Sequence, residues 1–310
     1  MIDVAMVTYN QEEFIANAIE SVLKQKTTFP FRLVIGEDCS TDNTREICLN
    51  YAKNHPEKIK LISQKSNQGL LKNYQSVFKE CNAKYLAILE GDDYWIDDYK
   101  LQKQIDLLES DSQIGFVHAN FNILTQSEVK RYIPPSHVKL AGHIYDDLIV
   151  GNFIGPLTVC ARKELIDKYV DFDVMLNLNF KTIDYVIWLE LSKNSVVGYQ
   201  NESVAVYRKE KGSVSLPSDF DKYEQFMISI LRTLNYFENK YSSTNKNIFN
   251  TSYNLIYYDL LLKAIHYKCY TKVQYYRLLF KPKSFLQYLK WLMCQNLLLL
   301  KLFKKIKFFN

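Results

Sequence analysis

Two short acidic clusters are the residues of this chain whose types and spacing could do chemistry. Glu37-Asp38 and Asp92-Asp93 each follow a run of apolar residues, and Gly91 allows a tight turn before the second pair. Carboxylate oxygens are the ligands that Mg²⁺ and Mn²⁺ prefer, in sites that usually keep positions open for phosphate oxygens. Because Asp-Asp pairs are also common in loops that bind nothing, the spacing alone leaves a metal site and an ordinary loop as equal alternatives.

The elements that must position these acids alternate along the first 110 residues. Short apolar, β-branched runs predict strands, and segments of helical periodicity follow most of them. The predicted strands are residues 2–8, 31–36, 59–63, 85–89 and 115–119. This alternation is typical of an α/β fold with a mainly parallel, Rossmann-like sheet flanked by helices. Ligands of such sheets bind at the carboxyl ends of the strands, where both acidic clusters are expected.

Other kinds of site are excluded by missing motifs. None of the nine glycines forms a G-x-G pair or precedes a lysine, which excludes the dinucleotide fingerprint and the phosphate-binding P-loop. The six cysteines form no C-x-x-C pair, and the five histidines show no metal-ligand spacing. The sequence therefore does not predict a dehydrogenase, a P-loop kinase or a zinc protein.

Charge is distributed unevenly along the chain. From Leu260 to the C-terminus there are ten Lys, one Arg and no acid, so this segment carries +11, and the net charge of +5 leaves −6 for residues 1–259. An acidic body is a poor partner for nucleic acid. The basic, apolar segment 284–310 predicts peripheral contact with an anionic membrane, with docking on the protein itself or on a second subunit, and disorder, as alternatives.

The N-terminal residues give information on the cellular location of the protein. The first twenty residues carry Asp3, Glu12 and Glu13 and lack a basic cluster before an apolar run. They therefore predict no secretory signal and a cytoplasmic location, with the basic tail at the inner face of a membrane.

Several motifs stand in the order found in one enzyme family. They are Val7-Thr8-Tyr9-Asn10, Glu37-Asp38-Cys39-Ser40-Thr41-Asp42-Asn43-Thr44, Leu89-Glu90-Gly91-Asp92-Asp93-Tyr94-Trp95, Ile183-Asp184-Tyr185-Val186-Ile187-Trp188, Tyr207-Arg208 and Gly212-Ser213-Val214-Ser215. Over about residues 2–216 the sequence resembles family-2 inverting glycosyltransferases, which have the nucleotide-sugar-binding GT-A fold. The resemblance implies a nucleotide-sugar-binding half at 1–115, an acceptor-binding and catalytic half at 116–216, and a helical C-terminal region at 217–310.

The resemblance also implies a role for each matching residue. Thr8, Tyr9 and Asn10 would line the base and ribose pocket, and Glu37 and Asp38 would belong to the donor site, with Asp38 bonding the base. Further along the chain, Asp93 would be the principal ligand of Mn²⁺ or Mg²⁺, Asp92 would meet the ribose or the metal shell, and Arg208 would help to neutralise the diphosphate. The family often carries His after Tyr-Arg, where this chain has Glu210 and Lys211.

Asp184 has two interpretations. At the start of the apolar segment 186–191 it could simply cap a helix, which the residues alone favour. The resemblance instead implies that it is the general base. The expected function is metal-dependent, inverting transfer of a sugar from a nucleotide-diphosphate-sugar to a hydroxyl of a glycan or lipid-linked acceptor, in surface polysaccharide biosynthesis. The alternative is a non-catalytic nucleotide-sugar-binding or scaffold protein of the same fold.

Overall fold

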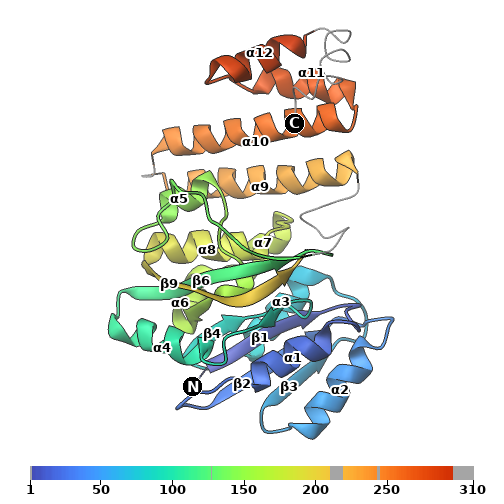
Figure 1. Cartoon of the computed structure of the whole chain (residues 1–310), viewed down its shortest axis with the longest axis vertical. Coiled ribbons are helices and arrows are strands. Elements are labelled where there is room, and N and C mark those ends of the chain that lie inside the picture. Colours follow the sequence, from blue (N-terminus) through green and yellow to red (C-terminus); the bar gives the residue numbers. More distant parts are fainter. Residues whose placement is uncertain (1, 127, 210–218, 243–244, 296–310) are drawn as a thin grey trace. The chain divides into compact units, whose positions relative to one another are not determined.

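A computed structural model describes residues 2–126, 128–209, 219–242 and 245–295 (Figure 1). The chain divides into two compact units. The first consists of Met1–Leu148 with Asn152–Glu210, and the second of Ile149–Gly151 with Lys211–Asn310. The predicted motif at residues 212–215 and the segment 296–310 lie outside the described residues.

The first unit is built on a nine-stranded mixed sheet with the order β3-β2-β1-β4-β8-β6-β9-β5, and β7 pairs with β6. The strands are β1 (Ile2–Thr8), β2 (Phe31–Glu37), β3 (Ile59–Ser63), β4 (Tyr85–Ile88), β5 (Tyr94–Trp95), β6 (Ile114–Leu124), β7 (Val129–Arg131), β8 (Cys160–Arg162) and β9 (Val196–Arg208). β1 pairs in parallel with β2 and β4, and β2 with β3. β8 runs antiparallel to both β4 and β6, and β6 pairs in parallel with β9.

Helices pack around this sheet. They are α1 (Ile15–Leu23), α2 (Thr44–Asn54), α3 (Leu70–Glu80), α4 (Lys100–Ser110), α6 (Lys163–Tyr169), α7 (Phe172–Asn177) and α8 (Ile183–Asn194), with α5 (Tyr145–Val150) and the 3₁₀ turn η1 (Pro156–Thr158). All seven residues of β1 are buried, as expected for a strand covered on both faces. Figure 1 shows β1 to β3 with α1 and α2 in blue, and α3 packs against β1 and β2.

The second unit is helical within the described residues. Its helices are α9 (Phe220–Lys240), α10 (Lys246–His266), α11 (Tyr270–Leu279) and α12 (Phe285–Met293). α10 packs against α9 and α11. Glu224 joins α9 to α11, because it accepts hydrogen bonds from the Tyr276 hydroxyl at 2.5 Å and from Lys272 Nζ at 2.7 Å. No helix of the part described is long and apolar enough to span a membrane.

The prediction of an α/β fold with a mainly parallel sheet is confirmed. The predicted strands at 2–8, 31–36, 59–63 and 85–89 correspond to β1 to β4 within one residue at either end. The strand predicted at 115–119 is longer, because β6 spans Ile114–Leu124. The 13-residue strand β9 was not predicted. Its pairing with β6 contains three register shifts, which break the regular alternation from which strands are recognised.

Lys100 is a charged side chain inside the first unit. It is fully buried, its Nζ donates to Gln104 Oε1 at 2.8 Å, and it lies 4.2 Å from the centre of the Trp95 ring. Burial lowers the pKa of Lys100 to about 7. The folded state therefore favours the neutral amine, whereas the unfolded chain keeps the proton at neutral pH.

This difference predicts a pH dependence of stability. Since the pKa of Lys100 falls from 10.5 to about 7 on folding, the unfolded state binds more protons between these values and stability rises with pH there. Relative to Lys100→Met, the wild type should gain up to ~1.4 kcal/mol per pH unit in this window. Thermal unfolding at several pH values measures the gain. Lys53→Met, at an exposed position of α2, is the control. The same change of stability with pH in the wild type and in Lys100→Met would contradict the prediction.

Candidate active site

The site begins where three parallel strands end at the same edge of the sheet. In the register of β1 and β2, Thr8 lies opposite Glu37. Past the end of β4, the Gly91 amide still donates to the Val7 carbonyl at 3.0 Å. The segments that follow β1, β2 and β4 therefore leave the sheet side by side, and the residues from three of the sequence motifs come together.

The turn after β1 and the loop after β2 hold each other through reciprocal hydrogen bonds. The Asn10 amide donates to Ser40 Oγ at 3.0 Å, and Asn10 Oδ1 accepts from the Thr41 amide at 2.8 Å. The Gln11 amide donates to Thr44 Oγ1 at 2.7 Å. Asn10 takes φ 52°, a left-handed conformation that Asn tolerates better than most residues. These bonds from Asn10, Ser40 and Thr44 therefore hold the turn after β1 against the loop after β2.

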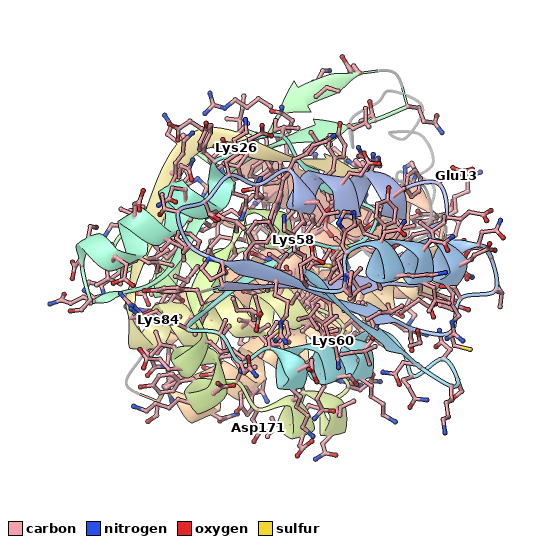
Figure 2. The ribbon with its side chains drawn as sticks, turned by 90° about the horizontal axis from the view of Figure 1, so that it is seen from below. Glu13, Lys26, Lys58, Lys60, Lys84 and Asp171 are labelled. Atoms are coloured by element: carbon pink, nitrogen blue, oxygen red, sulfur yellow. The ribbon has the colours of Figure 1, made fainter. Side chains whose placement is uncertain are left out.

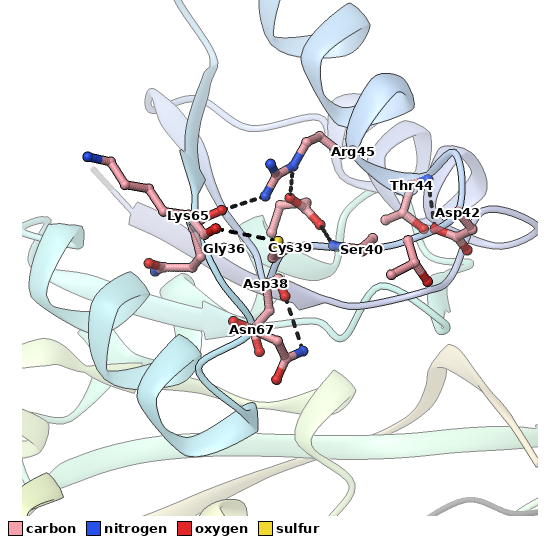
Figure 3. A network of polar contacts seen from close by, with 12 residues as sticks. Gly36, Asp38, Cys39, Ser40, Asp42, Thr44, Arg45, Lys65 and Asn67 are labelled. Carbon is pink, nitrogen blue, oxygen red and sulfur yellow. Dashed lines mark hydrogen bonds and ion pairs between the residues drawn. The ribbon is translucent and has the colours of Figure 1, made fainter.

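Glu37 organises the loop after β2 rather than pointing out of it. Its side chain is fully buried, with Oε1 accepting from the Ser40 amide at 2.6 Å and Oε2 from Arg45 Nε at 2.5 Å. Arg45 Nη2 also donates to the Gln64 carbonyl at 2.6 Å (Figure 3). Both oxygens of Glu37 thus have protein partners that hold the loop, and its place in the donor site stays a prediction.

Asp38 is placed in the same way. Its carboxylate is buried, with Oδ1 accepting from the Gln68 amide at 2.8 Å and Oδ2 from the Gly69 amide at 2.9 Å. The Asn67 side chain adds a bond to the Asp38 carbonyl at 3.1 Å, which Figure 3 shows. Asp38 therefore fixes the start of α3, and its contact with the donor base stays a prediction.

Thr8, Tyr9 and Asn10 differ in their accessibility. The Thr8 side chain is buried, and its hydroxyl donates to Gln11 Oε1 at 2.7 Å. Tyr9 is 43% exposed, and Asn10 is exposed as well. Among these three predicted donor-site residues, Tyr9 offers an exposed aromatic ring that a ligand can contact.

A cluster of carboxylates follows β4. One ligand oxygen from each of Glu90, Asp92 and Asp93 lies within 4.8 Å of the others. Asp93 is fully buried, and its Oδ1 accepts from the Arg208 amide at 2.8 Å. Its Oδ2 has no hydrogen-bond partner among the described residues. Glu90 Oε1 accepts from the Tyr74 hydroxyl at 2.8 Å.

The electrostatics of this cluster fit a bound cation. Burial, followed by the charges of Asp92 and Glu90, raises the pKa of Asp93 well above its usual range. Burial and then the charge of Asp92 raise the pKa of Glu90 to about 8. Three acids with too little positive charge nearby are unfavourable when desolvated, and a hard divalent cation with oxygen ligands would balance them. The unpartnered Oδ2 of Asp93 fits that need.

Arg208, at the end of β9, holds this strand to the acidic segment. Its Nη1 donates to the Asp92 carbonyl at 2.5 Å and its Nη2 to Asn17 Oδ1 at 2.8 Å. The guanidinium also lies 4.5 Å from the centre of the Tyr94 ring. Two of its five N–H groups are thus engaged within the protein, and its predicted contact with the diphosphate stays a prediction.

Asp184 lies near the acidic cluster although it comes from α8. It is half-buried, its Oδ2 accepts from Asn152 Nδ2 at 3.1 Å, and burial raises its pKa. Its negative charge also raises the pKa of Glu90 and of Tyr74, so Asp184 acts electrostatically on the acidic cluster. The N-cap position of α8 is Thr182, so Asp184 lies in the first turn rather than at the cap.

Some residues of the site were not predicted. Glu90 stands within the acidic motif, and its place directly after the predicted strand is a usable signal, but the resemblance implies no ligand role for it. Tyr74 and Asn152 reach the site from other elements, and their types alone give no such signal. Glu210 and Lys211 lie outside the described residues.

A cavity of about 900 Å³ also lies in the first unit, away from these residues. Lys84 and Asp171, both labelled in Figure 2, are among its lining residues. Its walls come from α3, α6, α7 and the segment 81–84 that precedes β4. None of the site residues described above lines it, so we do not assign the chemistry to this cavity.

Gly91 provides a test of how tightly the acidic segment is packed. A Cβ at this position would lie 2.6 Å from Gln11 Oε1 and 2.9 Å from Thr8 Cβ, closer than such atoms can approach. Gly91→Ala should therefore destabilise the protein by about 1–3 kcal/mol, measured by urea unfolding. Gly151→Ala is the matched control because a Cβ there meets no atom within 4 Å. Equal stability of the two variants would refute the packing argument.

Comparison with known proteins shows what this chain is similar to. Residues 3–155 match the family model for glycosyl transferase family 2. An uncharacterized protein of Mycobacterium bovis is 30% identical over 207 residues, which cover 66% of this chain and 58% of that relative. The chain thus aligns with less than two thirds of the length of this relative.

Two further relatives are covered over more of their length. TuaG of Bacillus subtilis, whose name refers to teichuronic acid biosynthesis, is 29% identical over 219 residues, 69% of this chain and 81% of TuaG. WfgD of Escherichia coli is named as a UDP-Glc:alpha-D-GlcNAc-diphosphoundecaprenol beta-1,3-glucosyltransferase. It is 27% identical over 221 residues, 69% of this chain and 79% of WfgD.

Solved structures share the fold. TarS 1-349 of S. aureus, in complex with UDP-GlcNAc, superposes with a TM-score of 0.58 at 16% identity over 89% of each chain. The mannosyltransferase PcManGT of Pyrobaculum calidifontis, in complex with GDP-Man and Mn²⁺, superposes with a TM-score of 0.56 at 14% identity, over 97% of this chain and 86% of its own. The resemblance and the fold predicted from the motifs are confirmed: residues 3–155 match glycosyl transferase family 2, and the fold is the GT-A fold.

Proposed function

We propose that this chain transfers a sugar from a nucleotide-diphosphate-sugar to a hydroxyl of a glycan or lipid-linked acceptor, with a divalent metal and with inversion at the anomeric carbon. The observation that carries the proposal is the group formed by Glu90, Asp92 and Asp93 with Asp184 nearby. This group offers a cation site and a separate carboxylate, which are the two requirements of a direct displacement.

Asp93, Asp92 and Glu90 are the residues that would hold Mn²⁺ or Mg²⁺. When bound, such a cation stabilises the negative charge that develops on the leaving diphosphate. The support within the protein is the buried Oδ2 of Asp93, which lacks a partner among the described residues, together with the raised pKa of Asp93. The Mn²⁺ in the PcManGT structure belongs to a protein of the same fold.

Asp184 is the residue that we assign as general base. Its carboxylate would take the proton of the acceptor hydroxyl while that oxygen forms its bond to the anomeric carbon from the face opposite the diphosphate. Burial raises the pKa of Asp184, which makes the carboxylate a stronger base than an exposed one. The hydrogen bond from Asn152 at 3.1 Å would hold the carboxylate in one orientation.

The donor would occupy the edge of the sheet formed by the turn after β1 and the loop after β2. Tyr9 is open to a nucleotide base, and the bonds that Glu37 and Asp38 make to backbone amides keep the loops in one shape. A nucleotide-sugar donor agrees with UDP-GlcNAc in TarS and GDP-Man in PcManGT. The names of TuaG and WfgD favour a surface polysaccharide and a lipid-linked acceptor.

Turnover of the donor tests the catalytic assignment. With a panel of nucleotide-sugars and Mn²⁺, the wild type should release nucleoside diphosphate from one donor, and Asp184→Asn should reduce transfer by about 10²–10⁴-fold, because the neutral amide cannot accept the proton. Donor affinity should stay unchanged in Asp184→Asn. Asp146→Asn, which replaces an exposed acid of α5, is the control.

The same measurement separates an enzyme from a non-catalytic binding protein. A binding protein would show metal-dependent affinity for a nucleotide-sugar without turnover of any donor, with or without acceptors. Unchanged transfer in Asp184→Asn would remove the general-base assignment and leave the reaction itself in place.

Metal binding can be measured without turnover. Because Mn²⁺ would neutralise the clustered acids only in the folded state, 1 mM Mn²⁺ should raise the melting temperature of the wild type by several degrees, and EDTA should reverse the effect. Asp93→Asn should abolish the increase. Asp146→Asn is again the control, and an equal shift in both variants would mean that the cation binds elsewhere.

A further inference from the structure

Helix α12 exposes the side chains that a helix in water normally buries. Phe285 is 77% exposed, Leu286 53% and Tyr288 48%. Lys290, in contrast, is only 9% exposed. A surface helix of a soluble protein normally turns its apolar residues inward and its lysines outward. The polarity of α12 is therefore suited to a surrounding that is less polar than water.

The preceding helix also exposes apolar side chains. On α11, Leu278 is 74% exposed and Tyr275 55%. Six of the sixteen exposed large apolar side chains of the described residues fall within the short stretch 275–288. We call this set the α11–α12 surface; it consists of Tyr275, Leu278, Leu279, Phe285, Leu286 and Tyr288. Single exposed apolar residues need no explanation, but such a concentration marks an interaction site.

Hydrogen bonds hold this surface in place. The segment between the two helices is tied to α10, because Asn254 Oδ1 accepts from the Lys281 amide at 2.7 Å and Asn254 Nδ2 donates to the Lys281 carbonyl at 2.9 Å. Trp291 Nε1 donates to the Arg277 carbonyl at 2.8 Å, which joins α12 to α11. The apolar side chains are thus presented by a fixed pair of helices.

Positively charged residues occur in the same stretch of the chain as the apolar side chains. Lys281 and Lys283 are exposed in the segment between α11 and α12. Arg277 stacks on Trp291 at 4.9 Å. No acidic residue follows Asp259 in the sequence, so no carboxylate of the segment from Leu260 onward offsets these cations. Apolar and aromatic side chains beside lysines match the boundary between acyl chains and anionic headgroups.

We infer that the α11–α12 surface binds the interface of a membrane that contains anionic lipids. The basic segment 296–310, or the same surface of a second copy, would bring positive charge onto positive charge, whereas anionic headgroups bring the opposite sign. The contact that we infer is peripheral, through the exposed side chains of α11 and α12. The sequence predicts membrane contact at 284–310, whereas this inference assigns the contact to residues within 275–288. The inference does not depend on the reaction proposed above.

Sedimentation with vesicles tests this inference on the full chain. The wild type should bind vesicles of mixed phosphatidylcholine and phosphatidylglycerol more tightly than phosphatidylcholine alone, and high salt should weaken this binding. Leu278→Ser/Phe285→Ser/Leu286→Ser should reduce the affinity by about tenfold or more. The matched control replaces three equally exposed apolar residues of the first unit, Leu49→Ser/Val129→Ser/Ile133→Ser, and should bind as the wild type does.

Trp291 gives a second, local measurement. Trp95 and Trp188 are buried, whereas Trp291 lies on α12 next to Tyr288, so brominated lipids should quench Trp291 and leave the fluorescence of a Trp291→Phe variant nearly unchanged. This readout holds even if the triple variant folds poorly.

Three results would overturn the inference. The first is equal binding of the wild type to anionic and neutral vesicles, or none to either. The second is loss of binding in a tail variant, Leu299→Ser/Leu300→Ser/Leu302→Ser, together with full binding by the α11–α12 variant, which would assign the contact to the tail. The third is a dimer in light scattering that the α11–α12 variant converts to monomer without any change in vesicle binding, which would make this surface a contact between copies.

Discussion

Parallel pairing of β1 with β2 and β4 is the constraint on which the site depends. The pairing places Thr8 opposite Glu37, and the Gly91 amide donates to the Val7 carbonyl beyond the end of β4. The three chain segments that follow these strands therefore leave the sheet at one edge. Buried apolar residues on both faces of β1 fix this register, because a slip of one residue would turn every side chain to the other face of the sheet. The chemistry of the edge is thus positioned by residues that take no part in it.

The second half of the sheet brings the remaining groups to that edge. β9 ends at Arg208, whose amide bonds the buried Asp93 and whose guanidinium bonds the Asp92 carbonyl. α8 supplies Asp184 from its first turn. Asp184 and Arg208 both come from positions more than ninety residues after Asp93 in the sequence. β8 runs antiparallel to both β4 and β6, so β6 and its parallel partner β9 have the direction of β4. The end of β9 therefore lies at the same edge of the sheet as the ends of β1 and β4.

The sequence allowed the strands and the acids to be predicted, but not how the acids are used. Periodicity identified β1 to β4, because each is a short apolar run between polar segments. Glu37 and Asp38 were recognised as acids at a strand end, yet their carboxylates bond Arg45 and the amides that follow. Whether a carboxylate faces a ligand or a backbone amide depends on the path of the neighbouring loop, which side-chain type does not determine. Tyr74 could not be assigned to the site for the same reason.

Two parts of the molecule contain side chains whose surroundings, within the described residues, are energetically unfavourable. In the first unit, Oδ2 of Asp93 is buried among acids without a hydrogen-bond partner in the described part. In the second, Phe285 and Leu278 face solvent from helices that hydrogen bonds hold in place. Each arrangement is unfavourable for the isolated chain, the first because a buried anion is poorly solvated and the second because apolar area stays in water. The proposed cation would relieve the first and the proposed lipid interface the second, and opposite charge would favour both.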